Sequence, residues 1–290
     1  MLTDVLLPAS LFIIMLGMGM TLTISDFSRV ILFPKAAILG LVNQLILLPI
    51  IAFSLAVLFK LDMIMAVGLM AVACAPGGAT TNLVTQVCKG NIALSVTLTA
   101  VASFISLITI PLILSKSLSY FGAKEDIVIK LPILQTMLQV MVITVIPISL
   151  GMGLRKLNTA FAMRMEKPMR IASVLIFAAI FVGIILENYD QIRIGIVSVG
   201  LVTLLLNLST MGIGYLGARL FKLSMKNAVT ISIESGIQNG TLSFVIVTTI
   251  LKNVEMGVPV AVYAIWMFLS AGVLMGLLGT KKADLNQAPV

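Results

Sequence analysis

The chain has 290 residues, of which 60% are hydrophobic and 10% are charged, and it carries a formal net charge of +8. Soluble domains usually have about 25% charged residues, so the composition excludes an ordinary soluble protein. The basic residues lie in short segments between long apolar runs, which predicts a role in membrane orientation and no nucleic-acid partner. The two cysteines, Cys74 and Cys88, lie in or beside one apolar run, so a disulfide framework is also excluded.

Nine apolar runs, each long enough to cross a bilayer as a helix, follow one another along the chain. We place these spans at residues 5–24, 36–58, 63–87, 91–114, 131–154, 169–186, 194–218, 227–251 and 258–279. No basic segment precedes the first run and no convincing cleavage site follows it, so we expect it to stay as a span. The predicted fold class is therefore an all-α polytopic membrane protein with nine transmembrane helices in the lipid bilayer.

The loops between the predicted spans differ in their content of Lys and Arg. With the N-terminus outside, the inner loops hold 13 of the 19 basic residues and the outer loops hold six. The thirteen are Arg29, Lys35, Lys89, Arg155, Lys156, Arg164, Lys167, Arg170, Arg219, Lys222, Lys226, Lys281 and Lys282. Because cytoplasmic loops are enriched in Lys and Arg, we expect a multi-pass protein of the cell inner (plasma) membrane, with the N-terminus outside and the C-terminus cytoplasmic.

Two predicted spans contain helix breakers near their middle. The third carries ACAPGGATTN (73–82) and the eighth carries ESGIQNG (234–240). Proline removes a helical hydrogen bond and glycine weakens a helix, and in a membrane such breaks are tolerated only inside protein or beside a cavity. The third and eighth spans cross in opposite directions, which predicts an inverted-topology repeat with its binding site where the two breaks meet.

Glu234 is the one acidic residue that lies well inside a predicted span, where no Lys or Arg is placed to pair with it. A charge at this depth is costly and is usually functional. The polar residues in the spans include Gln44, Thr81, Asn82, Gln238, Asn239 and a stripe of Ser95, Thr99, Ser103 and Ser106 at helical spacing. Oxygen ligands with one carboxylate suit a hard cation such as sodium, although Ser and Thr also join packed helices in membranes.

Four blocks are similar to the bile acid:sodium symporter family, over almost the whole chain and in the right order. They are FIIMLGMGMTLTISDF (12–27), ACAPGGATTN (73–82), KGNIALSVTLT (89–99) and ISIESGIQN (231–239). The resemblance implies a core domain with two crossing discontinuous helices and a panel domain beside it. We assign the panel to 1–62 and 116–224, the core to 63–115 and 225–280, and a cytoplasmic tail to 281–290.

The same resemblance implies two sodium ions as coupling ions, no other cofactor, and an organic anion as substrate. The ligands implied for the first sodium are Thr81, Asn82, Ser95, Thr99 and Glu234. Those implied for the second are Gln44, Glu234, Gln238 and backbone oxygens near Ser235 and Ile237. The resemblance implies that Asn239 faces the substrate, and we expect Gly77, Gly78 and Phe268 to face it as well. The chain departs from the family pattern after Trp266, where bacterial relatives that bind bile acids often carry polar residues and this chain has Met267 and Phe268.

The predicted function is a sodium-coupled secondary active symporter that imports an organic anion by alternating access. Family members suggest a bile acid-like anion, a steroid sulfate or a small acid such as pantoate. A proton-coupled carrier with Glu234 as the proton carrier is the alternative. An intramembrane enzyme is disfavoured because the sequence has no histidine and places no Lys or Asp in mid-span. A channel or receptor without coupled transport stays open.

Overall fold

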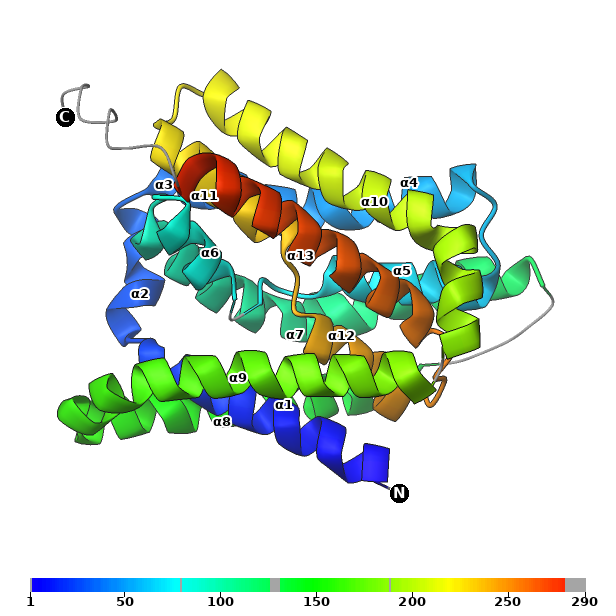
Figure 1. Ribbon diagram of the computed structural model, residues 1–290, viewed down its shortest axis with the longest axis horizontal. Coiled ribbons are helices and arrows are strands. Elements are labelled where there is room, and N and C mark those ends of the chain that lie inside the picture. The colour runs from blue at the N-terminus through cyan, green and yellow to red at the C-terminus, as the bar shows by residue number, and fades with distance from the viewer. Residues whose placement is uncertain (1, 79, 126–130, 188, 280–290) are drawn as a thin grey trace.

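The computed structural model describes residues 2–78, 80–125, 131–187 and 189–279, and the predicted tail at 281–290 lies outside them. The regular elements within these residues are helices, and most of the long ones run along the longest axis of the molecule (Figure 1). The helices are α1 (Leu2–Thr21), α2 (Ile24–Ser28), α3 (Pro34–Val42), α4 (Leu48–Leu58), α5 (Met63–Cys74), α6 (Thr81–Val87), α7 (Ile92–Ala123), α8 (Ile133–Leu157), α9 (Thr159–Glu187), α10 (Tyr189–Leu220), α11 (Met225–Gly236), α12 (Gly240–Val245) and α13 (Gly257–Gly279). Short helical turns at Arg29–Ile31, Asn43–Leu47 and Ile246–Ile250 continue α2, join α3 to α4 and extend α12.

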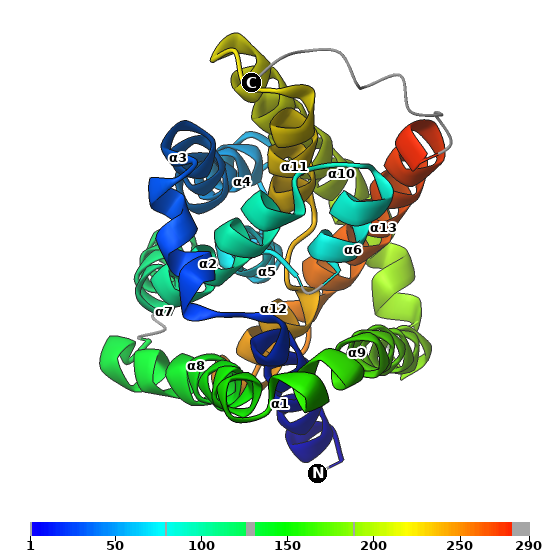
Figure 2. The same ribbon diagram turned by 90° about the vertical axis from the view of Figure 1, so that its left-hand side faces the viewer.

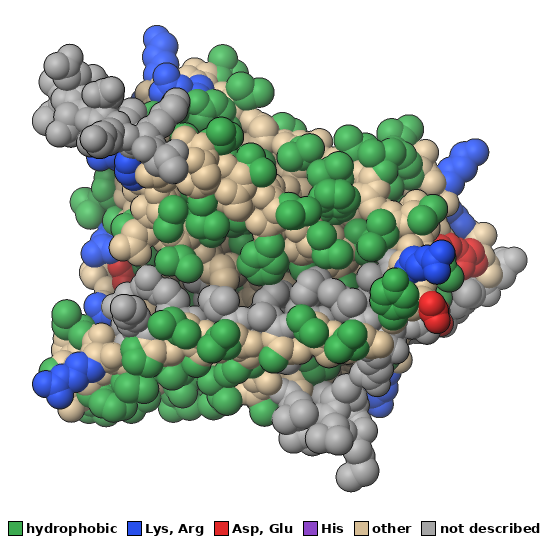
Figure 3. Space-filling model, in the orientation of Figure 1, with side chains coloured by type: hydrophobic (Ala, Val, Ile, Leu, Met, Phe, Trp, Pro, Cys, Tyr) green, Lys and Arg blue, Asp and Glu red, His purple; other side chains and the backbone are tan. Residues whose placement is uncertain are grey.

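The length and composition of the helices are those of a membrane protein. Among the described residues, five helical segments are long and apolar enough to cross a bilayer, or six if the bent pair Leu7–Thr21 and Ile24–Ile31 forms one span. The five are Pro34–Leu58, Ile92–Ala123, Ile133–Leu157, Arg193–Leu220 and Gly257–Gly279. On the face shown in Figure 3, Lys and Arg side chains lie toward the two ends of the long axis, with hydrophobic side chains between them. This distribution suits a bilayer whose normal follows that axis.

The third and eighth predicted spans are interrupted at the predicted places. In the third span, α5 ends at Cys74 and α6 begins at Thr81. In the eighth, α11 ends at Gly236, and α12 begins at Gly240 with its first turn capped by the Asn239 side chain. The local cause of the first break is the Pro-Gly-Gly sequence, which cannot continue a stable helix.

Two expected boundaries differ from the structure. The basic stretch from residue 155 to 168, expected as a loop, is helical almost throughout, because α8 continues to Leu157 and α9 begins at Thr159. Its Ala, Met, Arg and Lys residues are good helix formers, and charge alone does not end a helix. Helix α7 also continues unbroken to Ala123, so the expected core boundary at residue 115 falls inside a helix.

The helices form two bodies (Figure 2). Helices α1, α8 and α9 pack together in one layer, while α3–α7 and α10–α13 form the other body, with α10 along α11 and α13 and α4 beside α5. This arrangement differs from the expected panel of 1–62 and 116–224, because α3, α4 and α10 lie with the broken helices. Asn207 of α10 and Asn43, in the turn between α3 and α4, donate hydrogen bonds to α11 and so bury their amides within this body.

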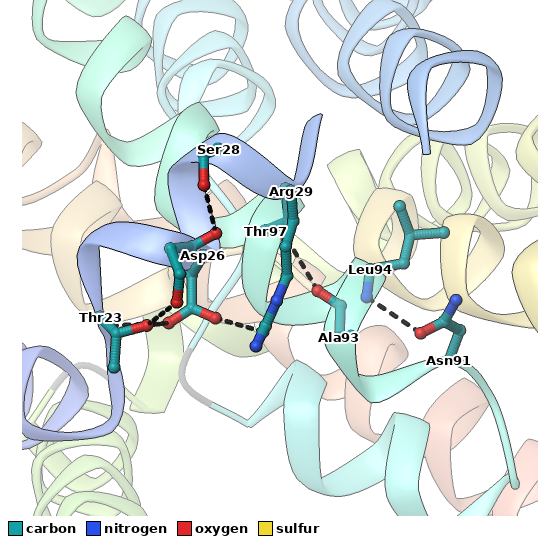
Figure 4. A network of polar contacts seen from close by, with 9 residues as sticks. Thr23, Asp26, Ser28, Arg29, Asn91, Ala93, Leu94 and Thr97 are labelled. Atoms are coloured by element: carbon teal, nitrogen blue, oxygen red, sulfur yellow. Dashed lines mark hydrogen bonds and ion pairs between the residues drawn. The ribbon is translucent and has the colours of Figure 1, made fainter. Parts of the chain in front are cut away.

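A buried carboxylate fixes the sharp bend where the chain passes from α1 to α2. The two helical segments that meet there differ in direction by 77°. Asp26 accepts hydrogen bonds from the backbone N–H (2.6 Å) and the hydroxyl (2.7 Å) of Thr23 and pairs with Arg29 (Figure 4). Phe27 packs edge-on against Phe104 of α7, with ring centroids 5.2 Å apart. The bend is therefore held from within and docked onto the larger body.

Candidate cation and substrate site

The two helix breaks lie against each other as a short antiparallel pair. Gly77 and Gln238 form the bridge between them. The backbone N–H of Asn239 donates to the Pro76 carbonyl at 2.8 Å, and that of Gly78 donates to the Ile237 carbonyl at 3.4 Å. Backbone groups freed by one break are thus paired with groups freed by the other, as burial in a membrane protein requires.

The Glu234 carboxylate lies beside this crossing and is 1% exposed. Its Oε1 accepts a hydrogen bond from Ser95 Oγ at 2.5 Å, and its Oε2 accepts one from Thr99 Oγ1 at 2.8 Å. Both hydroxyls come from α7, one turn apart. Among the described residues Glu234 has no ion-pair partner. The site therefore holds a buried carboxylate whose visible partners are neutral oxygens, and its charge needs compensation.

Further oxygens crowd around the Ser95 hydroxyl. Ser95 Oγ lies 2.8 Å from Asn82 Oδ1 as well as 2.5 Å from Glu234 Oε1, and Thr85 Oγ1 donates to it at 3.4 Å. A hydroxyl has one proton to donate, so Ser95 cannot satisfy both short acceptor contacts at once. A cation at this point would remove that conflict. Thr81 Oγ1 adds another oxygen, 3.4 Å from Thr99 Oγ1.

Gly77 lets the first break approach this carboxylate. A Cβ atom at Gly77 would lie 2.5 Å from Glu234 Oε2, 3.2 Å from Thr99 Oγ1 and 3.4 Å from Gln44 Nε2. The first of these distances is too short for any real contact. The backbone of α5–α6 therefore reaches the site only because residue 77 has no side chain.

A second group of oxygens lies on the backbone side of Glu234. Gln44 Nε2 donates to the Glu234 carbonyl at 3.4 Å, and Gln238 Nε2 donates to the Ser235 carbonyl at 2.8 Å. The Oε1 atoms of both glutamines are buried and have no hydrogen-bond partner among the described residues. Buried amide oxygens without donors are costly, and they are ligands that a hard cation accepts. The donor set thus fits a sodium ion.

The hydroxyl stripe on α7 divides into two parts. Ser95 and Thr99 contact Glu234, as described above. Ser103 Oγ donates to the Thr99 carbonyl at 2.7 Å, and Ser106 Oγ donates to the Ser103 carbonyl at 2.8 Å. Both hydroxyls donate to carbonyls of their own helix. This fits a role of Ser103 and Ser106 in helix packing and does not fit a role in cation binding.

The residues expected to face substrate have different surroundings. Asn239 uses its Oδ1 to accept a bond from the Leu242 N–H at 3.0 Å, while its buried Nδ2 has no partner among the described residues. A Cβ at Gly78 would lie 3.2 Å from the Gln238 carbonyl, so this position also needs a small residue. Phe268 is exposed on α13, whereas Met267 beside it is buried in the apolar core. The place of Phe268 in a substrate site stays a prediction.

Three buried polar residues near the end of α11 were not predicted from the sequence. Asn43 Nδ2 donates to Ser235 Oγ at 2.6 Å and to the Thr210 carbonyl at 3.1 Å. Asn207 and Tyr263 both donate to the Gly236 carbonyl. A signal for Asn43 and Asn207 was present, because an amide in the middle of an apolar span is costly unless it has a partner.

The chain matches one protein family and several known proteins. A family model described as the Sodium Bile acid symporter family matches residues 8–194. The chain is 34% identical over 268 residues to "Probable sodium/metabolite cotransporter BASS1, chloroplastic" of Arabidopsis thaliana, covering 92% of this chain and 65% of that protein. It is 29% identical over 278 residues to the "Uncharacterized sodium-dependent transporter YocS" of Bacillus subtilis (95% and 83% covered). It is 31% identical over 240 residues to the "Hepatic sodium/bile acid cotransporter" of Rattus norvegicus (81% and 65% covered).

These matches confirm the resemblance seen in the sequence. The chain spans 65% of the length of the Arabidopsis thaliana and Rattus norvegicus proteins, slightly less than two thirds. The matched proteins are named as transporters rather than enzymes, which agrees with the expectation from the sequence.

Proposed function

Because this chain belongs to the Sodium Bile acid symporter family, we propose that it is a sodium-coupled secondary active symporter that imports an organic anion by alternating access. The observation that carries the proposal is the Glu234 carboxylate. It is buried beside two crossed helix breaks, has no cationic side chain as partner among the described residues, and is surrounded by hydroxyl and amide oxygens.

In the first sodium site we place Glu234, the hydroxyls of Ser95, Thr99 and Thr81, and Asn82 Oδ1. These groups already lie within hydrogen-bonding distance of one another. A bound sodium supplies the positive charge that the carboxylate lacks.

In the second site we place the Oε1 atoms of Gln44 and Gln238 together with Glu234 and the backbone near Ser235 and Ile237. The unpartnered amide oxygens support this assignment. Since Glu234 belongs to both sets, the two sites share one negative charge, so an ion bound in one site should change the affinity of the other site for its ion.

The substrate site is assigned to the crossing itself, with Asn239, Gly77, Gly78 and Phe268 facing it. The free Nδ2 of Asn239 is a hydrogen-bond donor, so it suits an oxygen of an anionic substrate. The two glycines are buried at the crossing and carry no side chains that would fill it. Sodium bound at Glu234 reduces the repulsion between the carboxylate and an entering anion, which couples the two cargoes.

We also propose nine spans in an inverted-topology repeat. The segments LFKLDM (58–63) and LFKLSM (220–225) precede the two broken helices. In each segment a lysine with positive φ lies two residues after the end of a helix; φ is 51° at Lys60 and 60° at Lys222. In each, a side chain then caps the broken helix. Asp62 accepts a hydrogen bond from the Met65 N–H, and Ser224 accepts one from the Asn227 N–H. Positive φ is uncommon outside glycine, so this shared local structure favours a repeat.

For alternating access we propose that α1, α8 and α9 act as the panel and the remaining helices as the core. This division follows the two packed bodies in Figure 2. The charge bias of the loops supports an N-terminus outside the plasma membrane and a cytoplasmic C-terminus.

The deciding experiment is the melting temperature of purified protein in sodium chloride and in potassium chloride at equal ionic strength. A ligand that binds only the folded state stabilises it, by about 1.4 kcal/mol at ten times its Kd. We expect sodium-specific stabilisation in wild type, its loss in Glu234→Gln, and its retention in Glu255→Gln, the same change at an exposed loop residue. No sodium effect in wild type, combined with uptake that follows pH, would select the proton-coupled alternative.

A further inference from the structure

The carbonyl oxygen of Gly236, the last residue of α11, is held by side chains from two other helices. Asn207 of α10 donates to it through Nδ2 at 2.8 Å, and Tyr263 of α13 donates through its hydroxyl at 2.9 Å. Asn207 and Tyr263 also lie 3.4 Å apart, from Nδ2 to the hydroxyl oxygen. Both side chains are almost fully buried, at 0% and 1% exposure. We call this pair the Gly236 clamp.

The clamp acts where a helix ends inside the protein. The last carbonyl groups of a helix have no partner within it, and here the end of α11 is buried away from water. The carbonyls of Glu234 and Ser235 receive the amides of Gln44 and Gln238. The Ile237 carbonyl receives the Gly78 N–H from the other break.

The Gly236 carbonyl therefore faces α10 and α13, while the carbonyls on either side of it in the sequence face the crossing. A peptide unit is planar and rigid. Fixing the Gly236 carbonyl consequently fixes the orientation of the peptide that leads to Ile237. The hydrogen bonds from Asn207 and Tyr263 then also set the direction of the neighbouring carbonyl groups, although they act on the side of α11 that faces away from the crossing.

The absence of a side chain at Gly236 makes the clamp sterically possible. A Cβ there would lie 2.2 Å from Met211 Cγ and 2.5 Å from Met211 Sδ. Met211 is one turn beyond Asn207 on α10, on the same face. The close approach of α10 to α11 thus brings the Asn207 amide within reach. The amide must present its nitrogen, because its oxygen would meet the carbonyl oxygen of Gly236.

We infer that Asn207 and Tyr263 are positioning residues for the second sodium site. They hold the end of α11 in place at that site without touching the ion. The inference rests on the proposed function, because it concerns the backbone oxygens near Ser235 and Ile237 that were assigned to that site. It adds two residues that bind neither sodium nor substrate in the proposal but determine how well the site is formed.

The test is a titration of purified protein with sodium chloride, with potassium chloride keeping the ionic strength constant. The readouts are the melting temperature and direct equilibrium binding of radioactive sodium. The variants are Tyr263→Phe, which keeps the ring, and Asn207→Ala. The matched control is Ser232→Ala, which removes another buried hydrogen bond between α11 and α10, from Ser232 Oγ to the Met211 carbonyl at 2.9 Å.

We expect Tyr263→Phe to raise the sodium concentration at half-saturation by about three- to tenfold, the factor that one buried hydrogen bond typically contributes. Asn207→Ala should raise it at least as much. Ser232→Ala should lower the melting temperature by the same amount in sodium and in potassium and leave the half-saturation concentration unchanged. If Asn207→Ala does not fold, Tyr263→Phe alone decides.

Two negative results are distinguishable. A sodium effect in wild type that Tyr263→Phe leaves at the same half-saturation concentration overturns the inference and spares the proposed function. Absence of any sodium binding to wild type overturns the proposed function, and the inference falls with it.

Discussion

Gly77 and Glu234 come from different halves of the chain, and the backbone of one lies directly against the carboxylate of the other. A Cβ at residue 77 would be 2.5 Å from Glu234 Oε2. The two residues are also joined indirectly, since Gln238, which forms the bridge with Gly77, donates to the Glu234 carbonyl at 3.4 Å. The crossing and the carboxylate thus form one structural unit, and a change at either residue should disturb both.

The smallest change at this contact is Gly77→Ala. The added methyl group must displace the carboxylate or the first break, so we expect loss of sodium-specific thermal stabilisation and of sodium-dependent uptake. The control is Gly212→Ala, where a Cβ would meet no atom within 4 Å. Wild-type sodium dependence in Gly77→Ala would show that the close contact has no part in ion binding.

The two parts of the α7 stripe should also respond differently. Thr99→Ala removes the hydroxyl that donates to Glu234 Oε2 at 2.8 Å. A hydrogen bond to a charged group contributes about 1.5–3 kcal/mol, so the sodium half-saturation concentration should rise at least about tenfold. Thr99→Ser keeps the donor and should stay near wild type. Ser106→Ala, which removes a bond within α7 only, should not alter sodium binding; equal effects of Thr99→Ala and Ser106→Ala would refute the division.

The parts of the fold that were predictable are those with a local signal. Apolar runs of membrane length, the Pro-Gly-Gly sequence after Cys74 and the glycines after Glu234 are all visible in short windows, and the helices end where they indicate. The grouping of helices into two bodies was not predictable in this way. It depends on which face of α10 meets α11, and a pattern within one helix does not show which neighbour that face meets.

For the proposed site, the lone charge of Glu234 in an apolar span was the main signal in the sequence. The stripe on α7 was informative for Ser95 and Thr99 only. Helical spacing shows which hydroxyls share a face of α7, but it does not show where along that face a neighbouring helix turns away from α7. The mid-span amide of Asn207 was a signal in the sequence, but its partner was not, because Asn207 and Tyr263 share a backbone carbonyl and no sequence pattern shows which carbonyl a break leaves free.

The turn between α6 and α7 is hydrogen-bonded to α11 at Thr230 and Asn227, one and two helical turns before Glu234. Asn91 Nδ2 donates to Asn227 Oδ1 at 2.9 Å, and the Asn91 N–H donates to Thr230 Oγ1 at 2.8 Å. Asn91 also caps α7 by accepting the Leu94 N–H, as Figure 4 shows. Asn91 and Thr230 each precede a contacting residue, Ser95 or Glu234, by four positions, so this tie sets the register of α7 against α11.

A double-mutant cycle of Asn91→Ala and Asn227→Ala measures how much the contact between these two side chains contributes to the stability of the fold. Asn91→Ala should lower stability more than Asn227→Ala, because it also removes the cap of α7. We expect a coupling free energy of about 0.5–1.5 kcal/mol between the two changes, measured from melting temperatures in potassium chloride. Additive effects would mean that the contact between the two amides does not stabilise the fold.

The proposed panel depends on direct backbone contact between α1 and α8. A Cβ at Gly151 would lie 2.3 Å from the Leu16 carbonyl oxygen, whereas one at Gly153 would meet nothing within 4 Å. Gly151→Ala should therefore cost about 1–3 kcal/mol through overpacking, and Gly153→Ala should be neutral or slightly stabilising because alanine favours helices. The two melting temperatures test this, and equal values would contradict the close packing of the two helices.

The orientation of the chain can be tested at two exposed residues that are predicted to lie on opposite sides of the membrane. They are Glu255, before α13, and Lys156, at the end of α8. Both native cysteines are buried, so they are first replaced by alanine and the resulting parent serves as the unlabelled control. With the N-terminus outside, Glu255→Cys should react with a membrane-impermeant maleimide in intact cells. Lys156→Cys should react only after the cells are permeabilised. The reverse pattern would invert the topology, place the basic loops outside, and require the sodium gradient to act on the opposite face of the crossing.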